Sequence, residues 1–195
     1  MSDYTRVVAE GLAAAGEEVE VWCPPTRGPE RGVADWGENS GVSVRREMGR
    51  FTPSDLARVG RLLDAAPRPR RLLVQYVPHG YGYRSMNFAF CLWLWARAAS
   101  KGDRVEVLVH EPCVAFGEGS WKQDAAAVIH RAMAAVLLRA ARRVFVSTPA
   151  WEKSWRPYSL GKDFAFEWLP VPSTVPVRED AGRTAQVRSL YGASP

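Results

Sequence analysis

The stretch "LLVQYVPHGYGYRSMNFAFCLWLW", from Leu72 to Trp95, carries the pattern that decides the fold. An apolar run ends at Pro78, a loop with two glycines follows, and a second apolar run begins that is long enough for a helix. Short apolar runs and helical segments alternate in the same way along most of the chain. Strands separated by helices of this length indicate βαβ units and a parallel sheet. Right-handed crossovers then place helices on both faces. The sequence therefore predicts an α/β fold with a Rossmann-like, doubly wound sheet.

The remaining elements follow from apolar periodicity and from capping residues. Expected strands cover Glu18–Trp22, Val42–Glu47, Arg71–Val77, Arg104–His110, Arg143–Ser147 and Phe166–Pro170. Expected helices cover Ser2–Ala15, Thr52–Ala66, Ser85–Ser100, Gln123–Ala141, a short segment after Thr148, and Asp180–Tyr191. The Pro- and Gly-rich segment Pro24–Gly41 is expected to be a loop. In the strand after it, Val42–Glu47, the alternating pattern leaves charged residues exposed, so we expect that strand near a sheet edge.

Composition excludes several classes of protein. A chain of 195 residues with 47% hydrophobic residues suits one domain or a little more. The net charge is +5, but the basic residues are scattered and form no stripe or known motif, so no nucleic-acid partner is expected. The three cysteines lie far apart, which favours reduced thiols in a cytoplasmic protein over a disulfide or a metal site. The run Met86–Ala96 is shorter than the roughly 20 residues that span a bilayer.

Ligands of doubly wound sheets bind beyond the carboxyl ends of the strands. Here that edge is expected to hold the segments Pro78–Ser85, His110–Gly119 and Ser147–Trp151. The first of them combines flat aromatic rings with hydrogen-bond donors, which favours a ligand-binding role. An exposed loop whose tyrosines pack locally is the alternative interpretation.

The expected sheet lacks its usual first element. A doubly wound domain normally begins with its central strand, but here a capped helix starts at Ser2 and no G-x-G-x-x-G motif precedes it. The strands Glu18–Trp22 and Arg71–Val77 should then face a gap, each with one edge of unpaired backbone groups. We expect the reading frame to continue upstream of Met1, with an apolar strand of about five residues and a Gly-rich loop.

Four stretches match a known family: "SDYTRVVAEGLAAAGEEVEVW" (2–22), "VQYVPHGYGYRSMN" (74–87), "VLVHEP" (107–112) and "WLPVPSTVP" (168–176). In order and spacing the chain resembles the N-terminal domain of family-4 glycosyltransferases, which are retaining enzymes of the GT-B fold. Thr174 stands where an Asn is more often expected. The resemblance implies a Rossmann-like domain at 1–178 and the start of an interdomain linker at 179–195. It also implies a fragment truncated at both ends, which would be inactive alone.

The resemblance assigns roles to residues at the ligand edge. His110 would lie beside the donor sugar and orient a hydroxyl, without acting as a metal ligand; a structural histidine at a strand end is the alternative. Glu111 would bind an acceptor hydroxyl, or merely cap its loop. The other acceptor-binding residues would be His79, Gly80, Tyr81, Tyr83 and Arg84. Arg84 would also suit a phosphate on a lipid-linked acceptor.

The start of the first helix is the expected donor-phosphate side. Anions favour a helix N-terminus, and Ser2, Asp3 and Tyr4 lie there. No bound cofactor or metal is implied, since the nucleotide-sugar is a co-substrate held by the C-terminal domain.

Three other features have plainer interpretations. His130 lies mid-helix and is interpreted as a packing or surface residue. The aromatic run Phe88, Phe90, Trp93 and Trp95 is interpreted as buried core, with a membrane-contacting face as the alternative. The arginines Arg68, Arg70 and Arg71 are interpreted as a solvated turn at the edge opposite the site.

The function that the resemblance implies is hexosyl transfer from a nucleotide-sugar to a saccharide or a lipid-linked acceptor. The intact enzyme would be cytoplasmic, with peripheral contact to the inner membrane as an option. Two alternatives stay open: a standalone carbohydrate-binding or partner-interaction module, and another Rossmann-like nucleotide-dependent enzyme. The missing glycine fingerprint argues against the second alternative.

Overall fold

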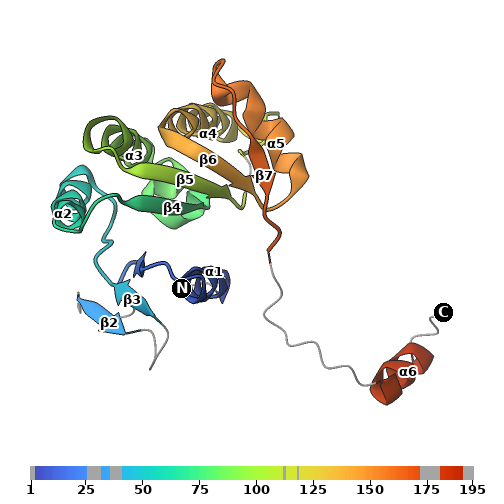
Figure 1. The fold of residues 1–195 in the computed structure, drawn as a ribbon. Coiled ribbons are helices and arrows are strands. Elements are labelled where there is room, and N and C mark those ends of the chain that lie inside the picture. Colours follow the sequence, from blue (N-terminus) through green and yellow to red (C-terminus); the bar gives the residue numbers. More distant parts are fainter. Residues whose placement is uncertain are drawn as a thin grey trace.

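The computed structural model describes residues 3–25, 32–35, 41–111, 113–117, 119–171 and 181–190. Its helices are α1 Asp3–Ala14, α2 Pro53–Asp64, α3 Phe88–Lys101, α4 Trp121–Ala140, α5 Pro149–Trp155 and α6 Ala181–Leu190 (Figure 1). Its strands are β1 Val19–Trp22, β2 Val33–Asp35, β3 Val42–Arg45, β4 Arg71–Tyr76, β5 Arg104–Val109, β6 Ala141–Val146 and β7 Phe166–Trp168. Short 3₁₀ turns cover Pro78–Tyr81, Tyr83–Ser85 and Arg156–Ser159. The expected elements are present with shifted ends, and the boundary expected at residue 178 lies outside the described residues.

The strands form a four-stranded and a three-stranded sheet. The first has the order β4-β5-β6-β7 and is parallel throughout, with β4 in register with β5 from Arg71 opposite Arg104 to Tyr76 opposite Val109. The second has the order β1-β3-β2, in which β1 and β3 are parallel and β2 is antiparallel. This arrangement of parallel strands and helices confirms the expected α/β class, a Rossmann-like half of a GT-B fold.

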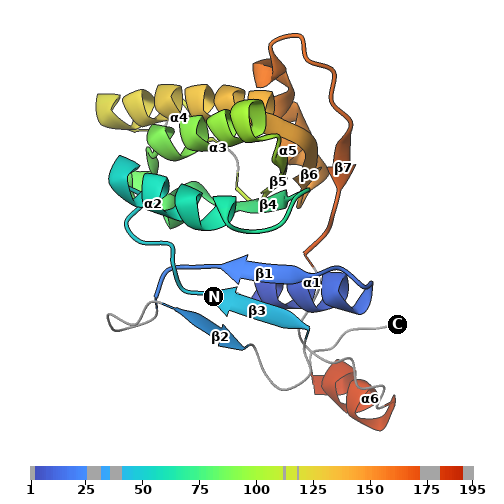
Figure 2. The same ribbon diagram turned by 60° about the vertical axis from the view of Figure 1, so that its left-hand side comes forward.

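Helices cover both sheets. The larger unit is the four-stranded sheet with its helices. In it α3 packs along α4, and α2 contacts α3 (Figure 2). Helix α3 contacts β5, and helices α4 and α5 contact β6. The core of this unit includes fully buried apolar residues of β5 and α4, among them Val107, Leu108, Met133 and Leu137. In the smaller unit α1 packs on β1 and β3 around Ala9, Val21, Val42 and Val44. The fold therefore has a large and a small apolar cluster.

The gap expected beside the first strand is confirmed. Within the described residues, β1 pairs with β3 alone and β4 pairs with β5 alone, so each has one edge without a partner strand. The amino ends of the two strands are linked by the ion pair of Glu17 and Arg71, at 3.6 Å. Their carboxyl ends lead into one pocket, which Pro24 and Gly80 both line. The two edges thus run in the same direction on either side of the gap.

The position of β3 differs from the expectation. It is the central strand of its sheet, because β2 forms inside the segment 24–41 that was expected to be a loop. The charges that suggested an edge have another cause. Arg45 of β3 lies 2.6 Å from Glu20 of β1, so the alternating charge is one half of a cross-strand ion pair.

The interpretation of Arg70 as part of a solvated turn is wrong. Arg70 is 7% exposed, and its Nε donates to Asp103 at 2.8 Å. Arg97 of α3 donates to the other oxygen of the same carboxylate at 2.5 Å. This cluster lies where β4 and β5 begin, so a buried charge network, and not water, stabilises this edge.

The aromatic helix α3 is only partly buried core. Phe90 is buried, whereas Phe88 and Trp95 are 37% and 47% exposed. α3 begins at Phe88 and not at Ser85, because the Asn87 side chain caps it by accepting from Phe90 N. Across the described part of the chain, no helix has the length and apolar character needed to cross a membrane.

Candidate functional site

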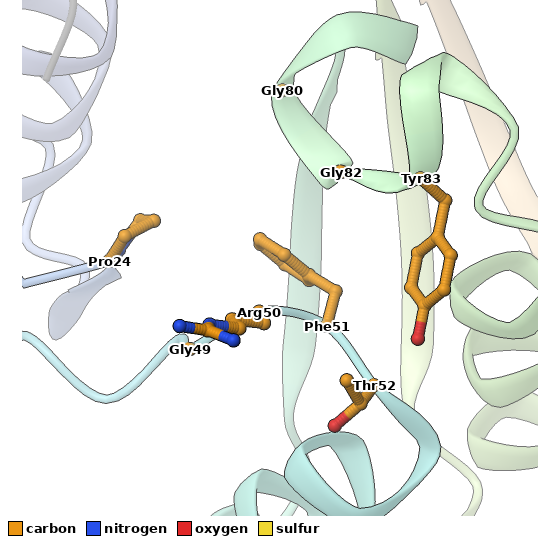
Figure 3. Close-up of a pocket in the computed structure, with 8 residues that line it drawn as sticks. All are labelled: Pro24, Gly49, Arg50, Phe51, Thr52, Gly80, Gly82 and Tyr83. Carbon is orange, nitrogen blue, oxygen red and sulfur yellow. The ribbon is translucent and has the colours of Figure 1, made fainter.

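A pocket of about 470 Å³ opens at the carboxyl ends of β1, β3 and β4. It is lined by Pro24, Gly49, Arg50, Phe51, Thr52, Gly80, Gly82 and Tyr83. Figure 3 shows Pro24 on one side, the segment from Gly49 to Thr52 along the base, and the turn that bears Gly80, Gly82 and Tyr83 on the other side. This is the edge at which open α/β sheets bind ligands.

Strained backbone forms two walls of this pocket. Phe51 has φ of 56° although it is a bulky residue, and Tyr83, Arg84 and Ser85 follow one another at φ of 52°, 51° and 72°. Such left-handed conformations are unfavourable without glycine and persist where surrounding contacts enforce them. The contacts here are specific: the Phe51 N–H donates to Asp55 at 3.1 Å, and Asn87 fixes the carbonyls of both loops.

Asn87 joins the two loops. Its side chain is 1% exposed, and its Nδ2 donates to the carbonyls of Phe51 at 3.3 Å and of Tyr81 at 2.6 Å. Its Oδ1 accepts from Phe90 N at 2.9 Å. One buried amide therefore caps α3 and holds together the loop after β3 and the loop after β4.

We predict that Asn87→Leu destabilises the fold by about 1–3 kcal/mol, because it leaves two buried carbonyls and one N–H unpaired. Urea unfolding followed by tryptophan fluorescence measures this change. The control is Ser100→Ala, which removes an exposed hydroxyl bonded to its own helix and should change stability by less than about 0.5 kcal/mol. Equal effects of the two substitutions would contradict the role assigned to Asn87.

His110 follows β5 at the same edge but does not line the pocket. Its Nε2 lies 2.9 Å from Gln75 Oε1, and its carbonyl accepts from Trp151 Nε1 at 3.1 Å. The ring of Tyr4 meets the imidazole edge-on, with centroids 4.8 Å apart. Side chains from β4, α5 and α1 therefore fix the histidine in place.

The surroundings keep His110 neutral. Burial lowers its pKa from the ordinary value, against a smaller opposing effect of the Glu111 carboxylate. With Gln75 Oε1 accepting from Nε2, the proton lies on Nε2 and Nδ1 carries a lone pair. A neutral imidazole in this tautomer can accept a hydrogen bond from a hydroxyl.

The remaining acceptor-side residues divide into three groups. Gly80 and Tyr83 line the pocket. His79 and Glu111 are exposed, lie 3.9 Å apart and link the loop after β4 to the loop after β5. Tyr81 is used internally, since its hydroxyl donates to the Gln75 carbonyl at 2.5 Å and its ring stacks on Phe90.

Other expected site residues lie away from the pocket lining. Arg84 is exposed beside Tyr83 but does not line the pocket. Tyr4 is 8% exposed, and burial raises the pKa of its hydroxyl. Ser2 and the side chain of Asp3 lie outside the described residues. His130 is 2% exposed and its Nδ1 accepts from Val114 N at 3.4 Å, in accord with a packing role.

The pocket also contains residues that the sequence reasoning missed. Gly49, Arg50 and Phe51 follow β3, and Pro24 follows β1. The rule that pointed to the loops after β4 and β5 applies equally to these strands. No group of three metal-binding side chains occurs in the ranges that the structure describes.

The fold and the pocket together identify the class of this protein. It is a Rossmann-like α/β domain with a pocket at the carboxyl ends of parallel strands, where such domains bind ligands. Residues 1–161 match the family model described as a glycosyl transferase 4-like domain, so the chain belongs to that family. Comparison with curated proteins and with solved structures gave no match.

Proposed function

We propose that this chain is the acceptor-side domain of a nucleotide-sugar-dependent glycosyltransferase, which transfers a hexosyl unit to a saccharide or a lipid-linked acceptor. The observation that carries the proposal is the pocket at the strand ends, at the same edge as a fixed neutral histidine, in a chain of this family. Glycosyl transfer needs both parts: a surface that orients the acceptor, and polar groups placed where charge develops.

The proposed roles follow from the geometry. The pocket holds the acceptor, and His110 orients a hydroxyl of the donor sugar through Nδ1. Gln75 holds the imidazole and Trp151 holds the backbone carbonyl of the same residue, which preorganises the site before the sugar arrives. His79 and Glu111, whose side chains lie 3.9 Å apart between the loops after β4 and β5, supply a donor and an acceptor for hydroxyls.

The chain alone should bind nucleotide-sugars weakly or not at all, because the proposal places the donor site mainly on a second domain. Calorimetry with a panel of UDP- and GDP-sugars measures this, and micromolar affinity for any of them would contradict the assignment. In the full-length protein, a labelled hexosyl unit from one of these donors should appear on a saccharide acceptor. A full-length protein that transfers no sugar from any donor would overturn the proposed function.

A further inference from the structure

Arg50 places a positive charge at the lining of the pocket. It lines the cavity and is exposed, and no hydrogen bond or ion pair engages its guanidinium among the described residues. The acids of the same segment are already paired: Glu47 lies 2.6 Å from Arg58, and Asp55 lies 3.0 Å from Arg58. Asp55 also accepts from Phe51 N. The local carboxylates therefore leave the charge of Arg50 available to a ligand.

The rest of the lining suits a sugar ring. Tyr83 lines the pocket with an aromatic side chain and is 50% exposed; Figure 3 shows Phe51 between it and Pro24. The glycines keep the walls open. A Cβ at Gly80 would meet nothing within 4 Å, whereas a Cβ at Gly49 would lie 2.5 Å from the Asp55 carboxylate. Gly49 is thus required by the protein's own packing, and Gly80 borders empty space that a ligand can fill.

We propose that the pocket binds the acceptor saccharide through an anionic group, a carboxylate or a phosphate, which Arg50 recognises. This inference rests on the proposed acceptor-side function and adds the chemical class of the acceptor. The guanidinium is planar and presents several N–H donors, so it can contact two oxygens of either anion at once. The sugar ring then lies against the turn that bears Gly80 and Tyr83.

The experiment measures binding to the whole 195-residue chain by calorimetry. The probes are a neutral disaccharide, the corresponding glucuronic-acid disaccharide, a hexose 1-phosphate, inorganic phosphate and UDP. The chain should bind one of the two anionic saccharides about tenfold more tightly than the neutral one, the advantage expected of one charge-assisted contact at an exposed site. The preferred anion distinguishes a carboxylate from a phosphate. Added salt should reduce the advantage.

Matched variants locate the effect. Arg50→Gln should abolish the tenfold preference for the anionic saccharide over the neutral one. Arg61→Gln, which removes an exposed arginine of α2 outside the pocket lining, should retain the preference. Gly80→Leu should weaken the binding of all saccharides, because a Cβ at this position meets nothing within 4 Å and the added side chain takes up space at the pocket lining.

Three outcomes would overturn the inference. In the first, neutral and acidic saccharides bind equally, Arg50→Gln has no effect and Gly80→Leu weakens binding. This result would contradict an anionic acceptor but would still agree with the acceptor-side function. Inorganic phosphate or UDP binding as tightly as the hexose 1-phosphate, and depending on Arg50, would show an anion or nucleotide site. If no saccharide binds, the pocket is not an acceptor site. The transfer assay on the full-length protein would then test the proposed function independently.

Discussion

His110→Ala should lower the turnover of the full-length protein by about 10²–10³-fold, which corresponds to about 2.7–4 kcal/mol of lost transition-state stabilisation. The physical reason is preorganisation. The imidazole is held by Gln75 at 2.9 Å, the Trp151 bond to the backbone carbonyl of His110 fixes the main chain that bears it, and burial keeps it neutral, so no reorientation is needed during transfer. The measurement is the initial rate of hexosyl transfer at saturating donor and acceptor, together with the thermal midpoint of the variant.

Two further measurements separate catalysis from folding. Gln75→Leu removes the partner of His110 Nε2 and should lower turnover less than His110→Ala, because the imidazole remains but loses its fixed tautomer. The pKa of His110 is lowered, so the neutral form is present at pH 7, and turnover should fall as the medium is acidified through that pKa. A folded His110→Ala protein with unchanged turnover would leave the residue with a purely structural role.

Sequence patterns were sufficient to predict the parallel α/β architecture, because the apolar periodicity and the capping residues that indicate each long strand and each helix lie within the element itself. The short strand β2 was not predictable. It has three residues inside a Pro- and Gly-rich segment, and its pairing with β3 is a tertiary contact. The gap between β1 and β4 was predictable, since it follows from the order in which a doubly wound sheet is built.

The candidate site was predictable in part. His110 and Gly80 follow conspicuous strands, and the strand-end rule placed both at the ligand edge. The sequence did not indicate Arg50. The cap Thr52 and the following Pro53 indicate a helix start, and no local pattern assigns a role to the residues before that start. The role of Asn87 as a link between loops depends on the folded position of Phe51, 36 residues away, which no local pattern encodes.

The charge network opposite the site should dominate the stability of the fold. Asp103 is the shared acceptor for Arg70 and Arg97, and its side chain is 1% exposed. The two arginines also donate to backbone carbonyls of α2 and the residues after it, Arg97 to Gly60 at 3.1 Å and Arg70 to Ala66 at 3.1 Å. One carboxylate therefore ties the start of β5 to α2 and α3.

Asp103→Asn should destabilise the protein by about 3–5 kcal/mol, because two buried guanidinium groups lose the buried carboxylate that both contact and keep only the more exposed Asp64, 3.0 Å from Arg97 and 3.7 Å from Arg70. Asp64 cannot replace it: Lys101 and Arg97 already lower the pKa of that carboxyl, which is ionised and engaged in the wild-type protein. A loss of this size is a large part of the 5–15 kcal/mol typical of a domain, so partial unfolding at 37 °C is expected. Urea unfolding at pH 7 gives the change directly.

The control for Asp103→Asn is Glu152→Gln, which breaks the Glu152–Arg156 pair one helical turn apart on the surface of α5. Both substitutions remove one negative charge and keep the side-chain volume, but exposed pairs contribute at most about 1 kcal/mol. If Asp103→Asn lowers the free energy of unfolding by less than about 1 kcal/mol, water reaches the two arginines and the network does not stabilise this edge of the sheet. Because the network lies at the strand starts and the pocket at the strand ends, the folded fraction of Asp103→Asn should still bind acceptor saccharides with wild-type affinity.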